Sequence, residues 1–134
     1  MARILVINDT QELLEMFRML LEQEGYEVVL SGMPILKVNE VEEIKPDLIV
    51  LDIIFGDNKT GWQMLQMLKM QRSTENTPII VCTAALHEVQ QQEGYLIAQN
   101  VRVIYKPFDI DAFLKAIEQA LAAQEKPSSE TEKV

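Results

Sequence analysis

The sequence has little of what several classes of protein require. Its single cysteine, Cys82, cannot form a disulfide within the chain, and because it lies in an apolar run we expect a buried, unreactive thiol. Its single histidine, His87, has no second histidine with which to share a metal ion, so we expect it at the surface. No apolar stretch approaches the roughly 20 residues of a membrane-spanning helix. These shortages argue against a disulfide scaffold, a histidine-based metal site and a membrane-spanning protein.

Basic residues are also few. Lysine and arginine number 12 against 21 aspartates and glutamates, which gives a net charge of −9. This balance disfavours direct binding to nucleic acid and to an anionic membrane surface. Only four apolar residues separate Arg3 from Asn8, which is too short a run for a signal peptide. We therefore expect a cytoplasmic protein that contacts neither nucleic acid nor membrane.

The most informative stretch is an apolar run that ends in an acid. Residues 48–51 read Leu-Ile-Val-Leu without polar alternation, which is typical of a central parallel strand covered on both faces. Asp52 follows directly. An aspartate in this place is either a turn residue or a reactive carboxylate held at the edge of the sheet, where open α/β sheets bind ligands.

Three other apolar runs also end in polar residues, and these favour the reactive interpretation. Parallel strands bring their carboxyl ends to one edge of a sheet, so the polar groups are expected to converge there. Two carboxylates held together repel each other and need a cation, and their hard oxygens suit Mg²⁺. A carboxylate beside Mg²⁺ and an ammonium group is a plausible nucleophile toward phosphorus. The converging residues are Asn8 and Asp9, Asp52, Thr83, and Lys106.

Strand and helix patterns alternate along the chain. Apolar positions three and four residues apart predict helices between five short strands, and Gly25 is placed to end the first helix. Such alternation predicts a parallel sheet with right-handed crossovers. Residues 125–134 contain one apolar residue and are expected to be a disordered tail, which leaves a single domain over residues 1–124. The expected strands cover residues 3–7, 26–30, 48–51, 79–82 and 101–105, and the expected helices cover residues 10–24, 34–44, 61–70, 84–99 and 108–123.

With these motifs in this order, the chain resembles the receiver domain of bacterial two-component response regulators over roughly residues 2–124. The resemblance implies a flavodoxin-like, doubly wound, five-stranded parallel sheet with strand order 2-1-3-4-5 and helices on both faces. It implies a cytoplasmic phosphoprotein of a phosphorelay, a monomer or weak dimer, that is not itself an enzyme but promotes its own phosphorylation and dephosphorylation. The matching segments are residues 4–9, 46–52, Gly61, 78–84 and 106–109.

The resemblance also assigns roles at the site. Asp52 would be the phosphoacceptor and form an aspartyl phosphate. Mg²⁺ would be bound by Asp9, by Asp52 and by the backbone carbonyl of Ile54, with Asn8 reaching it through water. The Lys106-Pro107 peptide bond is expected to be cis.

Two further roles concern the signal. Lys106 would pair with the phosphoryl oxygens. Thr83 would move its hydroxyl to the phosphate and report phosphorylation to the face formed by the fourth helix, the fifth strand and the fifth helix. The donor would be a sensor histidine kinase or a phosphotransfer protein. The downstream target would be another protein, whose identity the sequence does not give.

Four residues or spacings depart from the family pattern. Asn8 stands where a second acid is usual, which removes one charge from the Mg²⁺ site. Gly61 lies nine residues after Asp52, one more than usual, and Ile54 is apolar where polar residues often influence dephosphorylation. The residue three before the lysine is usually an aromatic switch, and here it is Val103. Tyr105, next to Lys106, is not expected to inherit that role.

Two alternatives are kept open. The first is a degenerate receiver, a protein-interaction module that works without phosphorylation, for which the departures argue. The second is an unrelated α/β protein, either a flavin carrier or a Mg²⁺-dependent phosphotransfer enzyme. The acidic segment after the first strand disfavours a flavin phosphate loop, and the apolar Ile54 disfavours a phosphatase with a second acid at that position.

Overall fold

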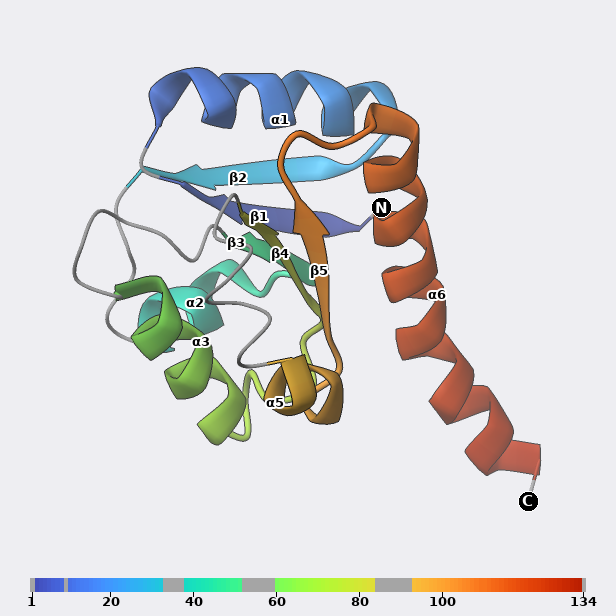
Figure 1. Cartoon of the computed structure of the whole chain (residues 1–134). Coiled ribbons are helices and arrows are strands. Elements are labelled where there is room, and N and C mark those ends of the chain that lie inside the picture. The colour runs from blue at the N-terminus through green and yellow to red at the C-terminus, as the bar shows by residue number, and fades with distance from the viewer. Residues whose placement is uncertain (1, 9, 33–37, 52–59, 84–92, 134) are drawn as a thin grey trace.

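The computed structural model describes residues 2–8, 10–32, 38–51, 60–83 and 93–133, and it forms a five-stranded parallel sheet flanked by helices (Figure 1). The strand order is β2-β1-β3-β4-β5, which confirms the predicted order and fold class. The strands are β1 (Arg3–Ile7), β2 (Glu27–Ser31), β3 (Leu48–Leu51), β4 (Ile79–Thr83) and β5 (Val101–Tyr105), and the helices are α1 (Gln11–Gln23), α2 (Val38–Ile44), α3 (Thr60–Met70), α5 (Glu93–Ala98) and α6 (Ile110–Lys133).

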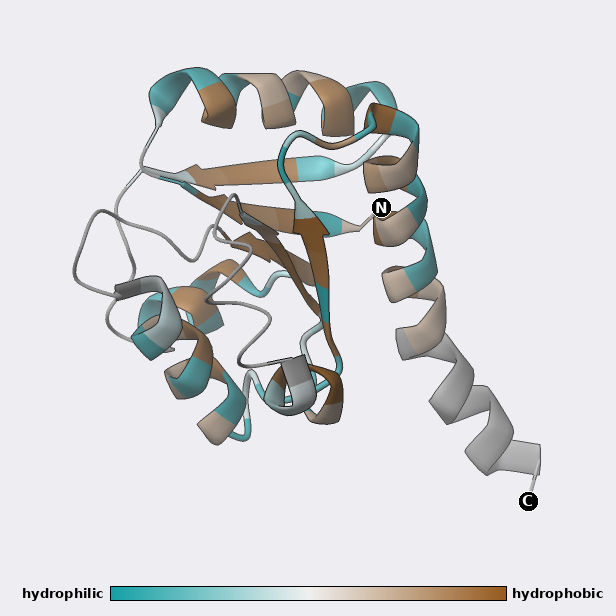
Figure 2. Ribbon diagram, viewed as in Figure 1, coloured by the Kyte–Doolittle hydropathy of each residue, from teal (hydrophilic) through white to brown (hydrophobic). Residues whose placement is uncertain are grey.

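The two faces of the sheet carry alternate residues of each strand. Odd-numbered strand residues such as Leu5 and Ile49 pack with α2, α3 and α5 in one buried cluster. Even-numbered residues such as Ile4 and Val50 pack with α1 and α6 in the other. Figure 2 shows the resulting hydrophobic colouring along the strands between the two helical layers. The alternation explains why the central strands have no polar positions, since both of their faces are covered.

Helix α1 illustrates how sequence periodicity becomes burial. Leu14, Phe17 and Leu21, spaced three and four residues apart, are its buried residues and pack against the sheet. The helix ends at Gln23, two residues before Gly25, whose φ of 89° lies in the left-handed region that favours glycine. The predicted face and end of this helix are both confirmed.

The last helix is longer than predicted. The sequence pattern placed its end near Ala123 and a disordered tail from residue 125, whereas α6 begins at Ile110 and its backbone continues as helix to Lys133. The alanines, glutamine, glutamate and lysine of residues 122–126 are strong helix formers, which accounts for the helix as far as Lys126 but not past Pro127, since proline disfavours a helix interior. Figure 1 shows this end of α6 extending away from the sheet. The domain boundary at residue 124 stays a prediction.

Other predicted elements are partly described. The second strand runs one residue later than expected, over Glu27–Ser31. Of the helix expected over residues 84–99, only α5 is described, and residues 84–92, with His87, lie outside the described residues. Pro34, the expected start of α2, lies outside them too. The Lys106-Pro107 bond is cis, as expected.

Lys69 holds the connection between α3 and β4. Its side chain is only 8% exposed, and its ammonium donates hydrogen bonds to the carbonyl oxygens of Glu75 and Thr77, each at 3.1 Å. The buried Thr74 hydroxyl donates to the carbonyl of Leu68 at 2.5 Å. Burial lowers the pKa of the Lys69 ammonium from its usual 10.5, and the nearby Glu75 carboxylate opposes that shift. This lysine thus satisfies backbone carbonyls that the loop leaves without helix or sheet partners.

We predict that Lys69→Met lowers the free energy of unfolding at neutral pH by about 1–3 kcal/mol, because the two carbonyl oxygens lose their donors. Chemical denaturation would measure the change. Lys115→Met, the same substitution at an exposed position of α6, is the matched control and should change stability little. An equal loss in both variants would contradict the role given to Lys69.

The lowered pKa gives this prediction a pH dependence. Between the lowered pKa of the folded state and 10.5, the unfolded chain binds more protons at Lys69 than the folded chain does. The stability of the wild-type protein relative to Lys69→Met should therefore rise with pH across that window. A stability difference that stays flat, or falls, would show that the buried ammonium is not disfavoured in the folded state.

Candidate functional site

The carboxyl ends of β1 and β3 are level with each other, and β4 and β5 continue two residues further and also end level with each other. Parallel register pairs Ile7 with Leu51, Leu51 with Val81, and Val81 with Val103. Residues that follow these pairs therefore emerge at one edge of the sheet, as the sequence predicted. This is the edge at which doubly wound sheets bind ligands.

Asn8 follows β1 at this edge and is 1% exposed. Its backbone amide donates to the carbonyl of Ser31 at 3.1 Å, which extends the pairing of β1 with β2. Its side-chain Oδ1 accepts a hydrogen bond from the amide of Thr10 at 2.8 Å. This Asx-type turn directs the chain from β1 into α1. The family pattern predicts Asn8 only as a neighbour of the metal, and its role in this turn is seen only in the structure.

Thr83 and Lys106 are tied together through the backbone. Thr83 ends β4, is fully buried, and is level with Tyr105 in the register of β5. The amide of Lys106 donates to the carbonyl of Thr83 at 2.9 Å, so the sheet pairing continues for one step past β5. The Lys106 residue is half-buried. A hydroxyl-bearing and an ammonium-bearing side chain are thereby held on adjacent strands at the same edge.

The predicted site residues divide into two groups. Asn8, Thr83 and Lys106 are described and lie at the same edge of the sheet. Asp9, Asp52 and Ile54 lie outside the described residues, although Asp9 follows Asn8 and Asp52 follows Leu51 in the chain. Within the described ranges there is no group of three or more His, Cys, Asp or Glu side chains able to hold a metal ion.

The usual position of the switch aromatic is occupied by a small side chain. Val103 is half-buried and packs against the cluster that α3 and α5 share with the sheet. Tyr105 packs against the same cluster, two residues further along the same face of β5. Valine has no ring that could move between buried and exposed positions, so β5 lacks that moving part at position 103.

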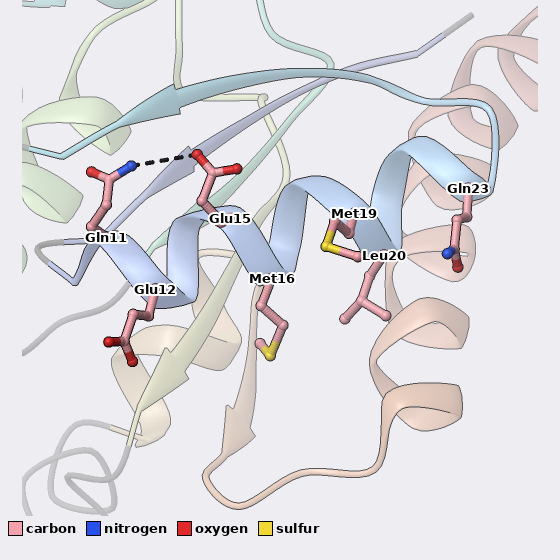
Figure 3. Close-up of a pocket in the computed structure, with 7 residues that line it drawn as sticks. All are labelled: Gln11, Glu12, Glu15, Met16, Met19, Leu20 and Gln23. Carbon is pink, nitrogen blue, oxygen red and sulfur yellow. Dashed lines mark hydrogen bonds between the residues drawn. The ribbon is translucent and has the colours of Figure 1, made fainter.

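A second feature lies on the outer face of α1. Seven residues of this helix line a shallow, largely apolar hollow (Figure 3). Met19 is 63% exposed there. The hollow belongs to one helix and lies apart from the strand ends, so its composition suits contact with another protein better than chemistry. Its lining residues are Gln11, Glu12, Glu15, Met16, Met19, Leu20 and Gln23.

Among the residues that the structure describes, no helix is long and apolar enough to cross a bilayer.

The fold and this edge define a doubly wound α/β protein of the flavodoxin-like class. Comparison with known families narrows the class. The sequence model of the response regulator receiver domain matches residues 4–118. The chain therefore belongs to the receiver domain family of two-component response regulators. This assignment sets aside the alternatives of a flavin carrier and an unrelated phosphotransfer enzyme.

Curated relatives agree with the family. The phosphate regulon transcriptional regulatory protein PhoB of Escherichia coli (strain K12) is 32% identical over 118 residues, which are 86% of this chain and 51% of that protein. The transcriptional regulatory protein YvrH of Bacillus subtilis (strain 168) is 25% identical over 139 residues, covering 97% of this chain and 55% of the relative. The chain thus spans about half the length of these relatives.

Solved structures agree on the fold. A CheY-like response regulator receiver domain protein from Methanospirillum hungatei JF-1 superimposes with a TM-score of 0.81 at 24% identity, covering 95% of this chain and 98% of the other. Vibrio cholerae chemotaxis protein CheY4 gives a TM-score of 0.75 at 25% identity, with 90% and 98% covered.

We predict that Asn8→Asp tightens Mg²⁺ binding by on the order of 1 kcal/mol, because it restores an anion while keeping an oxygen that can accept from the Thr10 amide. The added carboxylate should also lower the stability of the metal-free protein through repulsion. Titration of Mg²⁺ against the fluorescence of Trp62, the one tryptophan, would measure the affinity.

Asn8→Ala is the companion variant. It removes the Oδ1 acceptor and should cost about 1 kcal/mol of stability without tightening Mg²⁺ binding. Equal Mg²⁺ affinity in Asn8→Asp and the wild type would mean that Asn8 does not face the ion.

Proposed function

We propose that this receiver accepts a phosphoryl group on Asp52 and passes the signal to a partner protein through a change in its surface. The observation that supports the proposal most is that Asn8, Thr83 and Lys106 lie at one edge of the sheet. A hydrogen bond from the Lys106 amide to the Thr83 carbonyl joins two of them. These residues occupy the positions that the family pattern assigns to the neighbours of the phosphoacceptor. Asp9 and Asp52 themselves lie outside the described residues.

The chemistry is an in-line transfer. A carboxylate oxygen of Asp52 forms a bond to phosphorus as the bond from phosphorus to the donor nitrogen breaks, and that nitrogen leaves with the electron pair and takes a proton. The Lys106 ammonium pairs with a phosphoryl oxygen, and the Thr83 hydroxyl donates to another. The backbones of Lys106 and Thr83 are joined by a hydrogen bond before the reaction. The Thr83 hydroxyl then moves to the phosphate, and together with the Lys106 ammonium it stabilises the added charge.

A magnesium ion fits the donor set proposed for this site. The carboxylates of Asp9 and Asp52 and the carbonyl of Ile54 are hard oxygens of the kind that Mg²⁺ prefers, and Asn8 would contribute through water. The bound ion would neutralise charge on the transferred group. The chain supplies one carboxylate fewer than usual, because position 8 is an asparagine whose Oδ1 already accepts from Thr10.

The partners follow from the same proposal. The phosphoryl donor is a sensor histidine kinase or a phosphotransfer protein, and the exposed apolar surface of α1 around Met19 is a candidate contact for it. PhoB is named as a transcriptional regulator, and a relative from Mycobacterium leprae, MtrA, as a DNA-binding response regulator. We propose that the 134 residues here act in the cytoplasm through protein contacts rather than on DNA, since their net charge is −9.

The second candidate is a receiver that presents a fixed interaction surface without phosphorylation. The observation that favours it is Asn8, which replaces a usual acid and uses its side-chain oxygen in a local turn. The two candidates differ in one measurable property, which is whether Asp52 takes up phosphate.

We predict that phosphoramidate or acetyl phosphate with Mg²⁺ adds one phosphoryl group to the protein, and that Asp52→Asn abolishes the adduct. Intact-mass spectrometry would detect it. Asp111→Asn, the same change at an exposed acid in the first turn of α6, is the matched control and should leave the adduct intact. No adduct at millimolar donor, or an undiminished adduct in Asp52→Asn, would reject phosphorylation at this residue and leave the fixed-surface candidate.

A further prediction concerns how the signal leaves the site. Beryllofluoride should change hydrogen exchange across residues 84–99 more than across β5. The reasons are that Val103 has no ring to move, and that α5 is a short helix with Gly94 in its first turn, where glycine is about 1 kcal/mol less favourable than alanine. Hydrogen exchange with and without beryllofluoride would test this. Changes confined to residues 101–105 would show that the signal leaves through β5.

A further inference from the structure

Three phenylalanine rings, two of them buried and one half-buried, form a cluster that the proposed chemistry does not use. Phe17 lies on α1, Phe108 on the connection between β5 and α6, and Phe113 on α6. The centroids of Phe17 and Phe113 are 5.1 Å apart, and those of Phe108 and Phe113 are 5.3 Å apart, both pairs tilted. Phe17 and Phe108 are stacked at 6.1 Å with an interplanar angle of 8°. Each ring therefore contacts the other two, so movement of one requires the others to repack.

The cluster is connected to Lys106 by a short, well-fixed segment. Phe108 is two residues from Lys106. On the strand side, the Lys106 amide donates a hydrogen bond to the Thr83 carbonyl at 2.9 Å. On the helix side, the Phe113 amide donates to the Asp109 carbonyl at 3.0 Å, which begins α6. Because the segment is short and hydrogen-bonded on both sides, a displacement of Phe108 is expected to move Lys106 as well.

The other side of the cluster connects to the end of β1. Phe17 is 1% exposed and lies on α1, the helix that the turn from Asn8 to Thr10 positions. Its stacking on Phe108 thus joins the helix that follows the first strand end to the segment that follows Lys106. The ring contact spans two strand ends that are not neighbours in the sheet, since β3 and β4 lie between β1 and β5.

We propose that Phe17 is a positioning residue for Lys106, acting through Phe108. The stacked pair sets where the Lys106 ammonium stands relative to the acids that follow β1 and β3. This inference rests on the proposed function, because it matters to the reaction only if Asp52 is phosphorylated. A ring held solely for burial would contribute to stability and leave the rate of phosphoryl transfer unchanged.

The test uses Phe17→Leu, which keeps an apolar side chain at a buried position and removes the ring. The matched control is Leu21→Ala, on the same helix and in the same buried cluster, with a larger expected loss of stability. Phosphorylation by phosphoramidate is measured at saturating Mg²⁺ and donor, at a temperature where both variants are folded. The Mg²⁺ affinity of each is measured separately.

The expected result is a maximal rate about tenfold lower in Phe17→Leu, since a small misplacement of a charge-stabilising group is costly, with Mg²⁺ affinity unchanged. Leu21→Ala should keep the wild-type rate in spite of its lower stability. Equal rates in Phe17→Leu and the wild type, or equal slowing in both variants, would overturn the inference.

Hydrogen exchange separates this inference from the proposed function. In Phe17→Leu the Lys106 amide should exchange faster than the change in global stability explains, and in Leu21→Ala it should not. If the wild type takes up no phosphate, the proposed function fails, and this exchange measurement still decides whether Phe17 fixes the Lys106 segment. Unchanged relative protection at Lys106 would then overturn the positioning role.

Discussion

The level parallel register of β1, β3, β4 and β5 is the constraint on which the rest of this structure depends. Because Ile7, Leu51, Val81 and Val103 lie side by side across four strands, whatever follows them emerges at one edge. Burial maintains the register, since a slip of one residue would move each side chain of a strand to the other face and into a cluster in which it does not fit. The geometry of this edge therefore depends on apolar side chains packed on the two faces of the sheet.

The polar residues at that edge also support the fold. Asn8 uses its side-chain oxygen to shape the turn into α1, and the Lys106 amide extends the sheet by bonding to Thr83. Fully buried polar groups are expensive unless they are bonded, so these contacts are part of what lets the edge be buried at all. Substitutions here combine local structural cost with any effect on phosphoryl transfer, which is why matched variants such as Asn8→Asp and Asn8→Ala are informative together.

Much of the fold, and the edge at which the polar residues gather, could be predicted from single residues and their spacing. The four-residue run before Asp52, the strand ends and the buried face of α1 followed from apolar periodicity, because burial of one or two faces leaves a direct pattern in the sequence. The end of α6 could not be read this way. Residues 125–133 lack apolar positions, but they include good helix formers, and composition alone does not decide between tail and helix.

The sequence by itself determined the class of fold, the order of its elements and the family, because these depend on patterns that repeat within each strand and helix. Only the tertiary structure decided which distant residues meet. The hydrogen bond from the Thr10 amide to Asn8 Oδ1 is local but needs the strand to end where it does. The contact of Phe17 with Phe108 joins residues 91 positions apart (108 − 17). Contacts of that kind arise when helices pack on a shared sheet face, and no local pattern in either segment records its partner.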